Sequence, residues 1–252
     1  MLITGADSLY IFSPPYEQLA TMGILLYMAE KYRVYSPVIL RKKRSGGNMA
    51  KLHFKYGVMG SAKSLDLIRA NYNYREKGMD TIVLKPDKDS RDGDNECVIK
   101  ARVDGVSVNG SFIPSDDREY DKFIKELKER LKKEKISAIF IDEAQFLSKK
   151  QVEDMYGIVY ELDVPVLCYG LKNNFRSELF EGSKRLLELA DDLQEIIGIC
   201  HCGRKAKQNV RIVNGSIQYT GDEVVMGGVD EDAPIHYIAV CNHCYFKGNI
   251  KL

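Results

Sequence analysis

The sequence predicts an α/β protein built on a mostly parallel sheet, followed by a smaller C-terminal lobe. Apolar strand-like runs alternate with amphipathic helix-like segments between residues 50 and 192, the order typical of a parallel sheet covered on both faces. The first of these strands runs directly into a glycine-containing loop that ends in Lys63 and Ser64. Beyond residue 192, two close pairs of cysteines flank a segment with the pattern of a β-hairpin, which predicts a separate small unit.

The composition limits the classes of protein that this chain can belong to. The chain has 252 residues, of which 44% are hydrophobic and 29% charged, enough for one sizeable core with a small appendage. A formal charge of +1 argues against broad electrostatic binding to nucleic acid. No apolar run is long enough to span a bilayer, and the N-terminus lacks the pattern of a secretory signal. We therefore expect a cytoplasmic protein that binds neither nucleic acid nor membrane.

The first 48 residues fit poorly with the rest of the chain. Residues 16–32 have the apolar spacing of a helix, with proline-containing breaks on both sides, and the basic run 41–44 is typical of a solvated linker. The segment 46–49 can be encoded with a purine-rich ribosome-binding sequence just ahead of Met49. Our hypothesis is that the functional protein begins at Met49 and that residues 1–48 are a misassigned start or a dispensable extension.

The loop after the first strand has the pattern of a phosphate-binding P-loop. In such loops the backbone N–H groups surround phosphates, the lysine reaches the outer ones and the hydroxyl holds Mg²⁺. Its members are Gly57, Val58, Met59, Gly60, Ser61, Ala62, Lys63 and Ser64. Ala62 departs from the pattern, which asks for glycine before the lysine. If this residue takes a positive φ, its methyl group costs about 1 kcal/mol. An ordinary glycine and serine turn is the alternative interpretation.

The elements that follow can be assigned in order along the chain. We expect helices over 64–77, 121–133 and 183–190, and strands over 81–84, 136–141 and 164–168. A capping box at 148–151 opens a further helix. Residues 87–118 are polar and weakly periodic, which predicts a long excursion that carries one short strand at 98–103.

Two acidic residues, Asp142 and Glu143, follow the apolar strand 136–141 directly. Ligands bind at the carboxyl ends of strands in parallel sheets. An aspartate there can hold Mg²⁺ opposite a P-loop serine, and the adjacent glutamate can take a proton from an attacking hydroxyl. A single acidic pair in this position is also typical of a solvated turn. Together with Lys63 and Ser64, however, the pair favours a phosphate-handling site.

The ordered motifs resemble those of the type II thymidine kinases. The resemblance runs from about residue 51 to residue 246, and its motifs lie at 57–64, 85–86, 89–91, 142–146, 169–171, 175–176, 180–183, 190–191 and 241–244. It implies a RecA-like P-loop kinase domain over 50–192 and a zinc-bound lobe over 193–252 whose loop closes over the nucleoside, usually in a homotetramer. It also implies the reaction, which is transfer of the γ-phosphate of ATP to the 5′-hydroxyl of thymidine or deoxyuridine.

The resemblance assigns roles to individual residues. Lys63 stabilises the transferring phosphates, Ser64 ligates Mg²⁺ with Asp142 assisting, and Glu143 is the general base. The residues Asp89, Arg91 and Gln145 complete the ATP and phosphate site. The nucleoside site comprises Met59, Phe146, Leu171, Phe175, Asn209, Val225, Met226, Gly227, Gly228 and Tyr237.

The C-terminal lobe has the ligands of a structural zinc site. Cys200 and Cys202 precede a hairpin pattern centred on Asn214 and Gly215, and Cys241 and Cys244 follow it. Two close pairs around a hairpin are what a four-ligand zinc site requires, and such a lobe folds only with its metal. The family has two residues between its first two cysteines, whereas this chain has one, His201. Either Cys200 or His201 can therefore complete the site.

Several residues depart from the family pattern at the phosphate loop and the nucleoside side. They are Ala62, Asn174, Asn209, Asn242 and a lengthened segment at 231–236. We therefore keep three interpretations of function. An active thymidine kinase is favoured because Lys63, Ser64, Asp142 and Glu143 are all present. The alternatives are a catalytically impaired nucleotide-binding regulator and a RecA-like DNA-dependent ATPase.

Overall fold

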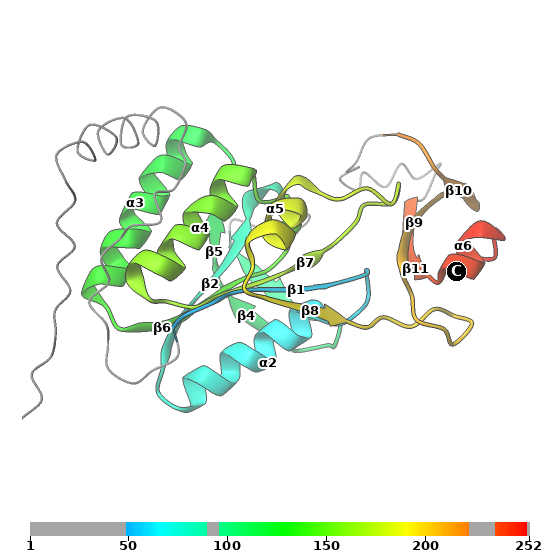
Figure 1. Ribbon diagram of the computed structural model, residues 1–252. Coiled ribbons are helices and arrows are strands. Elements are labelled where there is room, and N and C mark those ends of the chain that lie inside the picture. The colour runs from blue at the N-terminus through cyan, green and yellow to red at the C-terminus, as the bar shows by residue number, and fades with distance from the viewer. Residues whose placement is uncertain (1–48, 90–95, 222–234, 251–252) are drawn as a thin grey trace, which may run out of the picture. The chain divides into compact units, whose positions relative to one another are not determined.

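The computed structural model describes residues 49–89, 96–221 and 235–250 (Figure 1). The chain divides into a unit at Met1–Gly47 and a unit at Asn48–Leu252, and all of the described residues belong to the second. The hypothesis about residues 1–48, with the helix expected at 16–32, lies outside the described residues. None of the described helices combines the length and apolar composition needed to cross a bilayer.

A six-stranded sheet forms the centre of the unit, with strand order β5-β2-β6-β7-β1-β8. All of its strand pairs are parallel. The strands are β1 (Leu52–Gly57), β2 (Asp80–Pro86), β5 (Ser111–Ile113), β6 (Ile136–Ile141), β7 (Val166–Leu171) and β8 (Asp192–Ile196). The predicted α/β class with a mostly parallel sheet is confirmed.

Helices cover both faces of this sheet (Figure 1). Three of them, α3 (Asp117–Lys133), α4 (Lys149–Leu162) and α5 (Glu181–Leu189), pack on one face, and α2 (Lys63–Glu76) packs on the other. Strand β6 shows why both faces are covered, because Ile139 and Ile141 enter the first core while Phe140 enters the second. A strand buried on both sides reads as a continuous apolar run, which is why the sequence predicted β6 from its first residue to its last.

The helix starts follow the capping chemistry. Ser148 caps α4, and its side chain and that of Gln151 form the reciprocal hydrogen bonds of the predicted capping box. Helix α3 begins at Asp117, four residues before the expected start, because the carboxylate of Asp116 accepts hydrogen bonds from the N–H groups of Arg118 and Glu119 at 2.9 and 3.1 Å. An N-cap of this kind satisfies backbone donors that the helix itself leaves unpaired.

Two smaller sheets complete the fold. In the lobe, β9 (Gln208–Val213) pairs antiparallel with β10 (Ser216–Gln218) and with β11 (Ile235–Val240), and the short helix α6 (Asn242–Phe246) follows. Asn214 and Gly215 turn the first hairpin with φ of 51° and 74°, the conformation of a type I′ turn, so the predicted hairpin is confirmed. A second hairpin, β3 (Val98–Lys100) with β4 (Ser107–Asn109), lies in the polar excursion.

Candidate active site

The predicted phosphate loop joins the end of β1 to the start of α2. Ala62 is the N-cap residue of α2 and has φ of 62° and ψ of 30°. The positive φ expected at this position is therefore present, in the left-handed region that costs an L-residue energy. At the other end of the loop, Ser61 and the backbone of Ile196 lie close against Gly57. A Cβ at position 57 would lie 2.4 Å from Ser61 Oγ and 2.5 Å from the carbonyl oxygen of Ile196, so only glycine leaves room for them.

Lys63 lies inside the loop at the first position of α2. Its side chain is largely buried, and its Nζ donates a hydrogen bond to the carbonyl oxygen of Val58 at 2.8 Å. Unpaired N–H groups and the helix dipole give the N-terminus of a helix a partial positive charge. The ammonium group adds to that charge, so the loop is suited to binding an anion.

Ser64, in the first turn of α2, and Asp142, directly after β6, bring a hydroxyl and a carboxylate together. Ser64 Oγ donates a hydrogen bond to Asp142 Oδ2 at 2.9 Å. Asp142 is only 4% exposed. Burial, with the nearby charge of Glu143, raises the pKa of the Asp142 carboxyl to about 7, although Ser64 and Lys63 act in the opposite direction. Oxygen ligands of these two kinds are those that Mg²⁺ prefers, so the pair fits this ion.

Glu143 follows β6 directly and has a left-handed backbone, with φ of 49° and ψ of 37°. Gln145 Nε2 donates a hydrogen bond to Glu143 Oε2 at 2.6 Å, and Gln145 Oε1 accepts one from the N–H of Leu171 at 2.9 Å. Gln145 is almost fully buried and does not line the cavity described next. Its amide links the Glu143 carboxylate to the backbone of the neighbouring strand β7.

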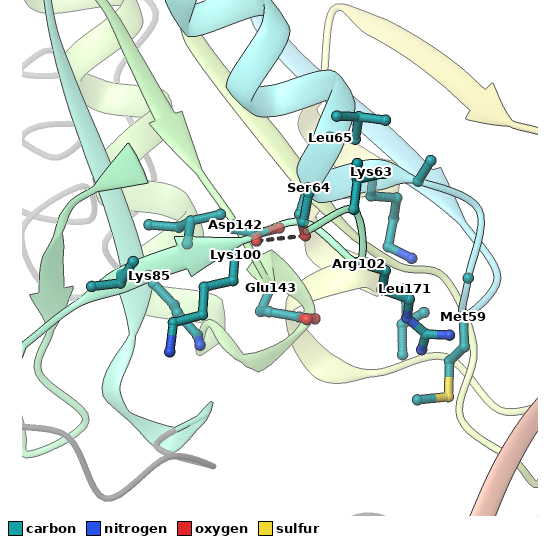
Figure 2. A pocket seen from close by; sticks show the side chains of 16 residues that line it. Met59, Lys63, Ser64, Leu65, Lys85, Lys100, Arg102, Asp142, Glu143 and Leu171 are labelled. Carbon is teal, nitrogen blue, oxygen red and sulfur yellow. Dashed lines mark hydrogen bonds between the residues drawn. The ribbon is translucent and has the colours of Figure 1, made fainter. Parts of the chain in front are cut away.

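These groups face a cavity of about 290 Å³ (Figure 2). The predicted site residues that line it are Met59, Gly60, Ala62, Lys63, Ser64, Asp142, Glu143 and Leu171. Ser61 does not line the cavity, because it is buried against Gly57. Lys85, Lys100 and Arg102 also line the cavity, and none was among the predicted site residues. Arg102 lies in the turn after β3, in a polar segment whose sequence pattern gives no signal of a phosphate site.

The aromatic side of the site centres on Phe175, which follows β7. Phe175 is 2% exposed, and the guanidinium of Arg211 lies 3.9 Å from its ring centroid, a cation–π contact. Arg211 Nη2 also donates a hydrogen bond to the carbonyl oxygen of Thr220 at 2.9 Å. Tyr237 pairs with Arg211 across β9 and β11. Arg211 therefore joins the predicted pocket wall to the lobe.

Phe146, the other predicted aromatic wall, packs edge-on against Phe180, with ring centroids 5.8 Å apart.

Asn209 connects three segments. Its Oδ1 accepts a hydrogen bond from the N–H of Met59, and its Nδ2 donates one to the carbonyl oxygen of Asn173, both at 2.8 Å. Asn209 lines a second cavity of about 210 Å³, as do the loop residues Gly57 and Val58.

Some predicted site residues are not placed. Arg91 and the segment with Val225, Met226, Gly227 and Gly228 lie outside the described residues. Asp89 ends the short helix η1 (Asp87–Asp89), but its side chain is likewise outside the described part of the chain.

The four predicted zinc ligands converge in the lobe. The Sγ atoms of Cys200, Cys202, Cys241 and Cys244 all lie within 4.8 Å of one another, a donor set that fits tetrahedral Zn²⁺. Cys200 belongs to this cluster despite the single-residue spacing. His201 lies beside it, with Nε2 3.6 Å from Cys244 Sγ. A hydrogen bond from the Arg204 backbone, with further bonds from neighbouring thiols, lowers the pKa of Cys202 to about 6, which favours the thiolate. Burial raises the pKa of Cys244 to about 12.

Comparisons with known proteins agree with this geometry. A family model described as thymidine kinase matches residues 50–245. A thymidine kinase of Haemophilus influenzae is 42% identical over 198 residues, which is 78% of this chain and 96% of that protein. Thymidine kinases of Streptococcus pyogenes serotype M3 and Streptococcus gordonii are 40% and 41% identical over 204 residues, covering 80% and 81% of this chain and 100% of each relative. The chain is therefore a kinase and belongs to the thymidine kinase family.

Proposed function

We propose that this kinase transfers the γ-phosphate of ATP to the 5′-hydroxyl of thymidine or deoxyuridine. The observation that carries the proposal is the arrangement around one cavity of Lys63, the bonded pair Ser64 and Asp142, and the carboxylate of Glu143. The relatives' name, thymidine kinase, supports the choice of acceptor.

On the donor side, the backbone N–H groups of the phosphate loop and Lys63 bind the phosphates. Ser64 and Asp142 would hold Mg²⁺, which would neutralise part of the negative charge of the phosphates. Asp89 and Arg91 contribute further phosphate contacts from the segment after β2, where the planar fork of arginine suits a phosphate. In this proposal Ala62 is tolerated, because its strained backbone keeps the loop in the shape that phosphate binding needs.

On the acceptor side, Glu143 takes the proton of the 5′-hydroxyl. The oxygen forms a bond to the γ-phosphorus, the bond from that phosphorus to the β-γ bridging oxygen breaks, and ADP leaves with the electron pair. The Gln145 amide holds the carboxylate in place at 2.6 Å. Positioning of this kind is the main contribution that a protein makes to phosphoryl transfer.

Met59 and Leu171 line the cavity, and we assign both to the nucleoside site. We assign Phe146, Phe175, Asn209 and Tyr237 to the same site, with the segment 225–228. The four cysteines would hold structural Zn²⁺, whose role is to fold the lobe. The division into a kinase domain at 50–192 and a lobe at 193–252, the start at Met49, the homotetramer and the cytoplasmic location remain predictions.

A steady-state assay with ATP, Mg²⁺ and a panel of nucleosides tests the proposal. Protein that begins at Met1 and protein that begins at Met49 are compared in parallel. We expect transfer to thymidine or deoxyuridine at equal rates in both. ATP binding without transfer to any nucleoside would refute the proposal and support the nucleotide-binding regulator instead, whereas ATP hydrolysis stimulated by DNA would support the ATPase.

A further inference from the structure

We propose that Arg102, on the hairpin of β3 and β4, contacts the transferring phosphoryl group and stabilises its charge in the transition state. This inference rests on the proposed phosphoryl transfer and adds a catalytic residue to it.

The hairpin is docked on the sheet. Ile99 and Cys97 are 1% and 7% exposed and belong to the core on the α2 face. The N–H of Gly110 donates to the carbonyl oxygen of Cys97 at 2.8 Å. A Cβ on Gly110 would lie 2.9 Å from both Ile99 Cδ1 and the carbonyl oxygen of Val83, so the hairpin approaches β2 closely. The position of Arg102 is therefore set by packing as well as by its own torsions.

The side chain of Arg102 extends from the hairpin toward the phosphate loop. The residue lines the cavity together with Gly60, Ala62 and Lys63, and a Cβ on Gly60 would lie 3.5 Å from Arg102 Nη1. In Figure 2 the carboxylate of Glu143 lies between Arg102 on one side and Lys85 and Lys100 on the other. No carboxylate within residues 49–89, 96–221 and 235–250 lies within ion-pair distance of Arg102.

The charge of the cavity matches that of a nucleoside triphosphate. Four cations line it, Lys63, Lys85, Lys100 and Arg102, against the two carboxylates of Asp142 and Glu143. Lys63 approaches the phosphates from the start of α2, whereas Arg102 comes from a different element at the loop's rim. A guanidinium can bond two phosphate oxygens at once, and an arginine that meets the transferring group stabilises the charge spread over its oxygens.

Kinetics on four proteins test the inference, namely the wild type, Arg102→Ala, Arg102→Lys and Arg75→Ala. Arg75 is an exposed arginine near the end of α2 that does not line the cavity, so it is the matched control. We expect Arg102→Ala to lower kcat about 10- to 1000-fold and to change the KM for thymidine by less than about threefold. Arg102→Lys should retain part of the rate, and Arg75→Ala should match the wild type.

Binding of a transition-state mimic gives an independent measurement. Arg102→Ala should weaken the complex with ADP, Mg²⁺, aluminium fluoride and thymidine by about the same factor as kcat, and should leave ADP affinity nearly unchanged. An active wild type with an equally active Arg102→Ala variant would overturn the inference alone. Equal losses of affinity for ADP and for the mimic would also overturn it, because the contact would then serve ground-state binding. A wild type that transfers phosphate to no nucleoside would overturn the inference together with the proposed function.

Discussion

Replacing Ala62 by glycine should stabilise this protein, although it removes a methyl group. Ala62 has φ of 62°, and a left-handed backbone costs an L-residue about 1–2 kcal/mol. Glycine removes that cost but gains conformational freedom in the unfolded chain, which offsets about 0.4–1 kcal/mol. We therefore expect the free energy of unfolding to rise by about 1 kcal/mol, equivalent to about 2–4 °C in Tm for a chain of this size.

Urea and thermal unfolding of Ala62→Gly and the wild type measure this difference. The matched control is Ala70→Gly, the same substitution in the right-handed interior of α2, which should destabilise by about 1 kcal/mol. Ala62 lines the cavity, but a methyl group makes no hydrogen bond to phosphate, so the KM for ATP should not rise in Ala62→Gly. A lower Tm for Ala62→Gly would refute the argument from backbone strain.

The remaining predictions concern the base, the metal and a partly exposed ion pair. Glu143→Gln should keep ATP binding and lose most of the transfer rate; near-normal turnover in the kinetic assay would contradict the base assignment. Zinc chelation should unfold the lobe and weaken thymidine binding before ATP binding, and unchanged nucleoside affinity in metal-free protein would argue against this order. Burial alone would raise the pKa of Asp66, but hydrogen bonds from Arg69 and Lys55 outweigh it and lower the pKa below 3.8. This carboxylate therefore stabilises the fold above pH 3.8 and loses that effect as pH falls through the lowered pKa. Asp66→Asn should cost about 1 kcal/mol at pH 7 in urea unfolding, since the group is partly exposed, and a cost that persists in acid would refute the ion-pair explanation.

The sequence was most informative where burial leaves a local pattern. Strand β6 is apolar at every position except Ser137 because both of its faces are covered, and Ser148 and Gln151 form their capping box within one helical turn. The loop pattern also singled out Ala62 as the residue where a positive φ would matter, and its φ is 62°. In each case the physical cause lies within a few residues of its effect, so single-sequence reasoning can find it.

Features that depend on distant partners were not predictable in this way. Strand β8 was missed because most of its residues are exposed and its pairing with β1 supplies the only signal. The expected phosphate role of Gln145 remains a prediction, and the sequence did not predict that its amide bonds both Glu143 and the backbone of Leu171. Arg102 reaches the phosphate loop from a polar segment without helical or apolar periodicity, and only the docking of Ile99 shows where it lies.

The backbone of Glu143 has a consequence for any effort to redesign this protein. A non-glycine residue with φ of 49° is strained, and such strain is common where function fixes the residue. Methods that select sequences for stability alone would favour glycine or asparagine at this position and would discard the carboxylate. Thermostable variants should therefore be selected with Glu143 held constant. A library in which position 143 is randomised should accumulate well-folded, inactive proteins.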